Sequence, residues 1–214
     1  MDYNSLENRI ARLEAYNEVQ RVMAKYMVIH IDGPHIANSP KLFALNTPGV
    51  LVRIAKWGVF RGKEQILKLY KEGHGDTSKP RPGTLVEHDL TTPIIEVAKD
   101  CQTAKAVWFS PGFYTVVEAG KKPVARWRWL KIGAAFIVED GVWKLWKYSI
   151  YSTFFADYYK SWVDWQPPDR PKIEELGPED APYDNPYKPD GIREPIPAAP
   201  EPYDTWDLPI DWIP

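Results

Sequence analysis

The sequence lacks most features of a metal site, a disulfide framework or a membrane segment. It contains one cysteine, Cys101, and four histidines among 214 residues. A single cysteine cannot form an internal disulfide, and no CxxC or zinc-type spacing occurs, so we expect a reducing compartment and no structural metal. No apolar run approaches the roughly 18 residues of a membrane span, and the polar N-terminus does not resemble a signal peptide. The sequence therefore predicts a cytoplasmic protein without a membrane partner.

Phosphate-binding loops and a basic surface are also missing. Neither GxGxxG nor GxxxxGK[ST] occurs. Residues 1–165 hold 23 Lys and Arg against 17 Asp and Glu, whereas residues 166–214 hold 4 against 12. A basic body followed by an acidic tail gives nucleic-acid binding little support.

Aromatic residues, in contrast, are abundant: 10 Trp and 12 Tyr contribute to an aromatic content of 14%. Apolar residues at helical spacing predict a helix over residues 5–31, ended by Asp32-Gly33-Pro34. A short helix over 35–46, a hairpin over 50–60 and a third helix from residue 62 follow. Four long strands are predicted beyond these elements, over residues 84–98, 103–117, 124–139 and 142–154. Helices followed by antiparallel strands indicate an α+β fold with a curved sheet packed on three N-terminal helices.

The last 49 residues form a segment of different composition. From Gln166 onward 13 of 49 residues are proline, which excludes a sheet or a long helix. Large apolar side chains such as Tyr203 and Trp206 are unusual in a free tail. We therefore predict a barrel domain over 1–165 and a Pro-rich acidic tail over 166–214 that packs on the barrel or on a neighbouring subunit.

Three stretches carry a resemblance to a known family. They are His88-Asp-Leu-Thr-Thr-Pro-Ile-Ile-Glu-Val97, Thr103-Ala-Lys-Ala-Val-Trp-Phe-Ser-Pro-Gly112 and Glu139-Asp-Gly-Val-Trp-Lys-Leu-Trp146. With the element order, over residues 5–155, they resemble the cone-shaped barrel of the nuclear-transport-factor-two-like superfamily, in its polyketide cyclase and scytalone dehydratase branch. The sequence and tail are also similar to diarylpropane lyases of lignin-degrading bacteria. The resemblance implies a lyase without a cofactor that releases formaldehyde from a bulky phenolic diol and leaves a stilbene.

The resemblance also implies an acid/base pair. His88 occupies the strand position of the branch's histidine, whose partner is an aspartate at the end of the first helix. That position falls here on Ile31, between His30 and Asp32, so the partner is left open. Tyr26 and His30 are spaced i, i+4 and share one helix face. In the alternative interpretation His88 and Tyr26 belong to the core and Asp32 only opens a turn.

Two strand lysines and several aromatic residues complete the set of candidates. By strand alternation Lys147 shares a face with Trp143, Leu145 and Tyr151, so we expect it, more than Lys131, to stabilise a phenolate. Both lysines could instead lie on the outer sheet face. Arg126 and Arg128 are expected to meet carboxylates of the tail or of a neighbouring subunit. An aromatic substrate would be lined by Trp57, Trp108, Trp129 and Tyr148.

The sequence thus predicts catalytic roles for His88, Asp32, Lys147 and Tyr26, and substrate contacts from His30, Lys131 and the aromatic residues. Other reactions at the same site (dehydration, isomerisation or cyclisation) and a non-catalytic binding or assembly module remain alternatives. Aromatic outer sheet faces predict a dimer or trimer.

Overall fold

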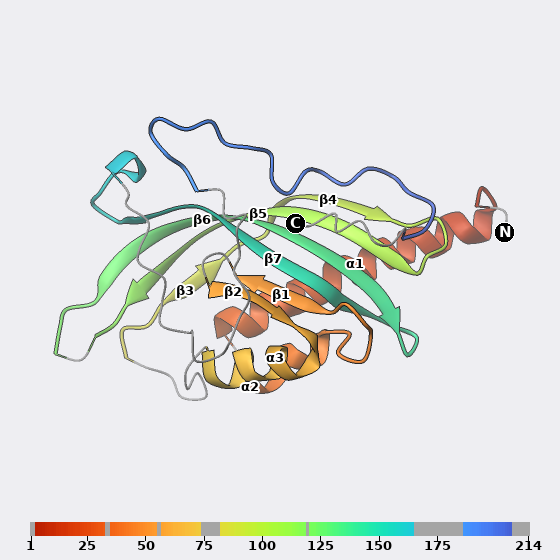
Figure 1. The fold of residues 1–214 in the computed structure, drawn as a ribbon, viewed down its shortest axis with the longest axis horizontal. Helices are drawn as coiled ribbons and strands as arrows, with labels where there is room; N and C mark the ends of the chain where they lie inside the picture. The colour runs from red at the N-terminus through yellow and green to blue at the C-terminus, as the bar shows by residue number, and fades with distance from the viewer. Residues whose placement is uncertain are drawn as a thin grey trace.

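The computed structural model describes residues 3–32, 35–54, 57–73, 82–118, 120–164 and 186–206, without the side chains of residues 32, 35 and 36. Its element order is α1 (Leu6–Asp32), α2 (His35–Asn38), η1 (Ser39–Leu42), β1 (Leu51–Ile54), β2 (Gly58–Arg61), α3 (Gly62–Lys68) and η3 (Leu69–Gly73), then β3 (Val86–His88), β4 (Thr91–Val97), β5 (Thr103–Val116), β6 (Val124–Glu139), β7 (Val142–Asp157) and η4 (Trp162–Asp164). This mixed α+β architecture with a curved sheet confirms the predicted fold class (Figure 1).

The sheet is built around the three longest strands. Its order is β2-β1-β7-β6-β5-β3, and β4 also pairs with β5. All the described neighbours are antiparallel except β1 and β7, which run parallel. Strands β6 and β7 each have 16 residues, long enough for the sheet to twist and curve around the helices.

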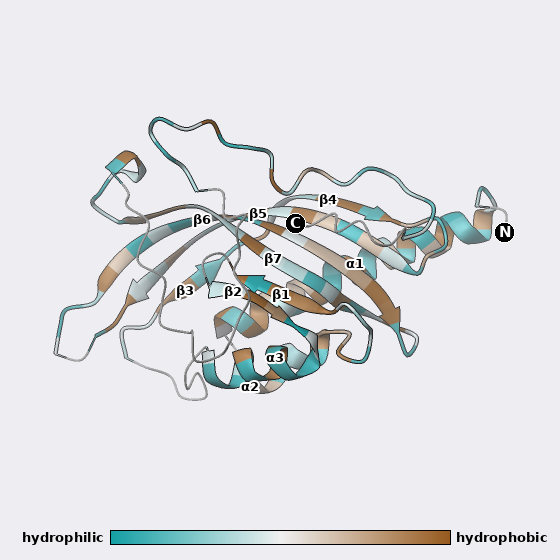
Figure 2. Cartoon of the chain, viewed as in Figure 1, coloured by the Kyte–Doolittle hydropathy of each residue, from teal (hydrophilic) through white to brown (hydrophobic). Residues whose placement is uncertain are grey.

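The helices cover one face of the sheet, called here the helix-covered face. Met23 and Tyr26 of α1 are buried with Val52, Ile132 and Tyr148 of the strands in one core cluster. Figure 2 shows hydrophilic and hydrophobic residues mixed along α1 and α3. On α1 the buried side chains begin at Ala15, whereas Leu6, Ile10 and Leu13 remain exposed. In the described residues no helix is long and apolar enough to cross a membrane.

The opposite face, called here the outer face, carries the described part of the tail. Residues 186–206 run along the side of the sheet away from α2 and α3 (Figure 1). Trp206 contacts Trp146, with ring centroids 5.0 Å apart, and the ammonium of Lys105 lies 4.9 Å from the centroid of Trp206. The Lys99 ammonium forms an ion pair with Asp204 at 2.6 Å, and the backbone N–H of Lys99 donates a hydrogen bond to the carbonyl of Tyr203. Aromatic packing and charge pairing therefore hold this segment against the sheet.

Two predicted elements differ in the structure: the second helix is shorter than predicted, and one predicted strand is divided into two. The second helix ends at Leu42 instead of residue 46, because Pro40 lies in its last turn and Phe43 bridges to Leu145 of β7. The strand predicted over 84–98 is split into β3 and β4. Thr92 has a φ of 50°, and the register with β5 shifts between Thr91 and Ile94. Pro93 cannot donate a ladder hydrogen bond, which accounts for an irregularity here.

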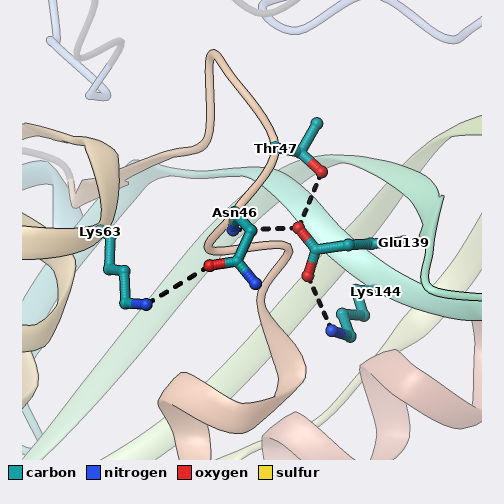
Figure 3. Close-up of polar contacts among 5 residues, drawn as sticks. All are labelled: Asn46, Thr47, Lys63, Glu139 and Lys144. Atoms are coloured by element: carbon teal, nitrogen blue, oxygen red, sulfur yellow. Dashed lines mark hydrogen bonds and ion pairs between the residues drawn. The ribbon is translucent and has the colours of Figure 1, made fainter.

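A buried carboxylate ties the loop after η1 to the β6–β7 hairpin (Figure 3). Glu139 accepts hydrogen bonds from the Asn46 backbone N–H at 3.0 Å and the Thr47 hydroxyl at 2.8 Å. Its other oxygen accepts one from Lys144 at 2.7 Å. Burial alone would raise the pKa of Glu139, but these bonds bring it below the usual range. Through these three hydrogen bonds the Glu139 carboxylate holds the loop after η1 against the β6–β7 hairpin.

Candidate functional site

His88 ends β3 on the helix-covered face and is 4% exposed. Its Cα pairs with Gly112, which pairs in turn with Arg128 of β6. Gly112 has no side chain, and this allows the imidazole to lie directly against β5: a Cβ there would be 2.7 Å from His88 Nδ1 and 2.2 Å from the Glu87 carbonyl oxygen. The glycine therefore makes room for the imidazole.

The imidazole of His88 faces the Arg128 guanidinium. Arg128 Nη1 lies 3.4 Å from His88 Nε2. Because a guanidinium only donates hydrogen bonds, this contact makes Nε2 the acceptor and places the proton of the neutral ring on Nδ1. Burial and the adjacent positive charge of Arg128 lower the pKa of His88 to about 3. In the free protein His88 is consequently neutral at physiological pH.

His30 is the residue of α1 whose ring contacts His88. The two imidazole rings stack, with centroids 5.2 Å apart and planes 24° from parallel. His30 also stacks on Tyr26, one helical turn earlier, at 6.4 Å. Of the predicted residues at the end of α1, His30 is the one that the described side chains bring to His88. The side chain of Asp32 lies outside the described residues.

Buried phenols continue the cluster from Tyr26. The Tyr26 and Tyr70 hydroxyls are 2.9 Å apart, and the Tyr26 and Tyr148 rings are 4.8 Å apart. Burial raises the pKa of all three phenols well above the usual value, so each stays protonated. Protonated phenols can donate hydrogen bonds to a substrate oxygen, and their rings offer an aromatic surface.

The remaining residues that were predicted to contact substrate divide between the two faces. Trp108 is buried on the helix-covered face and contacts Phe136, and Trp57 is half-buried against the core. Trp129 stacks on Phe154 on the outer face and is 39% exposed. Lys131 also lies on the outer face, where its ammonium donates to the carbonyl of Pro197 in the tail. The structure thus separates Trp129 and Lys131 from His88.

The predicted placement of Lys147 beside Leu145 is wrong. Ala135 pairs with Lys147 while Phe136 pairs with Leu145, so a bulge at Trp146 reverses the alternation of β7. Lys147 therefore lies on the outer face, with its ammonium 5.2 Å from the ring centroid of Trp146 and 5.6 Å from that of Trp206. The outer-face alternative is thus the observed one, but Lys147 is only 4% exposed, so its ammonium lies beside aromatic rings and does not reach water.

Arg128 is the residue that sequence reasoning assigned elsewhere. Its guanidinium lies at His88 and 4.8 Å from the ring centroid of Phe155, whereas Arg126 pairs with Asp157 of β7. The expected contacts of both arginines with carboxylates of the tail concern residues that lie largely outside the described ranges. Arg128 alternates along β6 with Leu130 and Ile132, which are both buried. This pattern in the sequence could have placed Arg128 on the helix-covered face. Ser110, fully buried two residues before Gly112 on the same face of β5, was also missed, and among the described residues its hydroxyl finds no hydrogen-bond partner.

Charged residues that would hold a metal ion do not gather at this site. Within the described residues no group of three or more His, Cys, Asp and Glu side chains is arranged to bind a metal. What the described cluster brings together is a neutral imidazole, a guanidinium and protonated phenols. Such a set can stabilise an oxyanion and move a proton.

Comparison with solved structures shows the same fold in several bacterial proteins. A hexachlorocyclohexane dehydrochlorinase of type 3 from Novosphingobium barchaimii aligns with a TM-score of 0.56 at 15% identity, covering 75% of this chain and 99% of the other. A proposed scytalone dehydratase from Novosphingobium aromaticivorans aligns with a TM-score of 0.54 at 18% identity, covering 72% and 93%. A proposed dehydratase of the nuclear-transport-factor-two-like family from Streptomyces avermitilis aligns at 0.53 and 14% identity, covering 66% and 98%.

No curated protein matches the sequence. Residues 11–149, which include His30, His88 and Arg128, match the family of the SnoaL-like domain. This match covers more than half of the chain and agrees with the curved sheet, the covering helices and the structural neighbours. The chain therefore belongs to the SnoaL-like domain family.

Proposed function

We propose that the chain is a lyase that works without a cofactor on a small phenolic molecule, with the reaction centred on His88 and Arg128. The observation that carries this proposal is the buried neutral imidazole of His88, with Nε2 facing the Arg128 guanidinium. The names of the structural neighbours support the class, because a dehydrochlorinase and a dehydratase both carry out eliminations.

Arg128 takes the role that the sequence assigned to Lys147. Arg128 is half-buried, and a guanidinium in such a site stabilises a phenolate or another oxyanion of the substrate. With a pKa of about 3, His88 is a weak base in the free protein. Burial is the larger cause of this low pKa and the Arg128 charge is the second; an anionic oxygen beside Arg128 offsets that charge and takes over the hydrogen bond of the guanidinium, which frees Nε2 of His88 to accept a proton. In the proposed reaction the cluster of protonated phenols at Tyr26, Tyr70 and Tyr148 donates a hydrogen bond to the departing hydroxyl, in exchange for one of the hydrogen bonds within the cluster.

The specific reaction that we propose is the deformylation of a lignin-derived diarylpropane diol. Loss of the phenolic proton and the benzylic hydroxyl releases water and gives a quinone methide. A base then takes the proton of the primary alcohol, the bond to the hydroxymethyl carbon breaks, and formaldehyde leaves. The bonding electrons return to the ring as phenolate and leave a stilbene. The diol is thus converted into stilbene, water and formaldehyde, and no electron donor or acceptor is needed.

The test is incubation of metal-stripped protein with an erythro diguaiacylpropane diol, following stilbene absorbance in the near ultraviolet and trapping formaldehyde. We expect both products in equal amounts. His88→Asn and Arg128→Met should each lower the rate by about 10² to 10⁴, the usual contribution of one acid/base group. Arg126→Met is the matched control, because Arg126 lies on the same strand but pairs with Asp157. Full turnover by folded His88→Asn and Arg128→Met proteins would refute the assignment.

The structural neighbours favour a second candidate, dehydration without carbon–carbon cleavage. Both reactions begin with loss of a hydroxyl and place the same demands on His88 and Arg128. Release of formaldehyde distinguishes the two reactions, because a dehydratase would consume the diol without releasing formaldehyde.

A further inference from the structure

Two buried polar groups lie beside each other on the helix-covered face without a hydrogen-bond partner. Within the part of the chain that the structure describes, neither Nδ1 of His88 nor the hydroxyl of Ser110 is hydrogen-bonded, although His88 is 4% and Ser110 0% exposed. We propose that these two groups bind the benzylic hydroxyl of a phenolic substrate, and that Ser110 makes the site specific for an alcohol at this position. The inference rests on the proposed function, because it takes the phenol oxygen to lie at Arg128.

Strand pairing places Ser110 and the imidazole next to each other. His88 of β3 pairs with Gly112 of β5, and a Cβ on Gly112 would lie 2.7 Å from Nδ1. Ser110 precedes Gly112 by two residues, so its side chain leaves β5 on the same face, roughly 7 Å further along the strand. Leu130, which pairs with Ser110, and Trp108, two residues earlier on β5, both belong to the core cluster on this face.

The two groups together match the hydrogen-bonding capacity of an alcohol. Because Nε2 of His88 faces the Arg128 guanidinium, the proton of the neutral ring is on Nδ1, which is therefore a donor. The hydroxyl of Ser110 can accept a hydrogen bond. An alcohol can thus accept from Nδ1 and donate to Ser110, and its second lone pair is left for the phenol cluster. A methyl group in the same place would leave both buried groups unpaired, so the site should favour the alcohol.

The positions of the two groups also indicate where the alcohol stands on the substrate ring. Arg128 lies at Nε2 of His88, whereas Gly112 and Ser110 lie on the side of Nδ1. A phenol oxygen at Arg128 and an alcohol oxygen at Ser110 are therefore separated by the imidazole ring. A benzyl alcohol with its hydroxymethyl group para to the phenol keeps its two oxygens apart by the length of the benzene ring. The ortho isomer holds them side by side and should bind without using Ser110.

The experiment is isothermal titration calorimetry of the full chain with two small phenols that differ in one hydroxyl, 4-hydroxy-3-methoxybenzyl alcohol and 2-methoxy-4-methylphenol. We expect the wild type to bind the alcohol about five- to tenfold more tightly, as one or two hydrogen bonds provide. Ser110→Ala should lose this preference, because the proton of the alcohol then has no acceptor. Its urea midpoint should be no lower than that of the wild type, since among the described residues the Ser110 hydroxyl has no partner to lose.

Ser149→Ala is the matched control. Ser149 is also 0% exposed, but it lies on the outer face, because its neighbours Tyr148 and Ile150 both belong to the core cluster. The Ser149→Ala chain should therefore keep the full preference for the alcohol.

Three results would overturn the proposal. They are equal affinity of the wild type for the two phenols, no binding of either phenol at concentrations on the order of 10 mM, and a preference that Ser110→Ala retains. Turnover of the diguaiacylpropane diol by the same proteins distinguishes this proposal from the proposed reaction. A preference that depends on Ser110 in a chain that does not convert the diol rejects the reaction and keeps the alcohol site. Conversion of the diol with equal kcat/KM by the wild type and Ser110→Ala rejects the alcohol site and keeps the reaction.

Discussion

Gly112 is the residue on which the position of His88 depends. Its missing Cβ would lie 2.2 Å from the Glu87 carbonyl oxygen, a backbone atom that cannot rotate away. Gly112→Ala must therefore displace β3 from β5, and we expect a loss of about 2–3 kcal/mol in unfolding free energy with a fall in turnover. Urea unfolding at pH 7 measures the change in unfolding free energy. Gly120→Ala is the control: its Cβ meets nothing within 4 Å, and only its φ of 75° costs about 1 kcal/mol. Equal losses in the two variants would contradict the steric argument.

Arg128 and His88 together make stability sensitive to acid. The folded chain lowers the pKa of His88 from 6.5 to about 3, so folding favours the neutral ring. The resulting stability is present above pH 6.5 and is lost as the pH falls from 6.5 toward 3. Between pH 7 and pH 5 the loss should be about 2 kcal/mol by this linkage.

Urea unfolding at pH 7, 6 and 5 checks this expectation. His88→Phe should remove most of the dependence in this interval, and Arg128→Met should reduce it because the neighbouring charge is gone. A wild-type curve no steeper than that of His88→Phe would show that His88 titrates normally in the folded chain.

At the scale of elements, Glu139 shows how one side chain fixes two connections. Glu139→Ala leaves Lys144, the Thr47 hydroxyl and the Asn46 N–H without their acceptor (Figure 3). We expect a loss of about 3 kcal/mol at pH 7, because breaking a buried ion pair strands its partners. Thermal unfolding monitors the change. Glu118→Ala is the comparison, since Glu118 pairs with Lys121 in solvent and its removal should leave stability unchanged. A Glu139→Ala protein as stable as the wild type would disprove the structural role.

The element order was predictable because it depends on local patterns. Strand alternation and the Asp140-Gly141 turn signal gave β6 and β7, and helical spacing gave α1. The face on which Lys147 lies was not predictable, since the bulge at Trp146 reverses the alternation and leaves no mark in the sequence. The partner of His88 was equally hidden. Arg128 and His30 reach it through strand pairing and helix packing, which are long-range contacts.

At the scale of the whole molecule, the sheet separates the proposed reaction site from the outer face. The helix-covered face holds His88 and Arg128, while the outer face holds the described part of the tail, residues 186–206. Because neighbouring residues of β6 point to opposite faces, Trp127 and Arg128 belong to different surfaces although they are adjacent in sequence. Substitutions on one face of the sheet should therefore leave the other face unchanged.

The melting temperature offers a test of that separation. If the native chain is a dimer, unfolding also dissociates it, and the melting temperature rises with protein concentration. For an unfolding enthalpy of about 0.7 kcal/mol per residue, the rise should be about 2 °C per tenfold increase in concentration. Differential scanning calorimetry over two decades of concentration measures it. Tyr159→Glu, which places a charge at an aromatic position that is 95% exposed beyond the end of β7, should weaken this dependence while keeping turnover. Arg128→Met should keep the dependence while losing turnover. A change in both properties in either variant would mean that the two faces are coupled through the sheet.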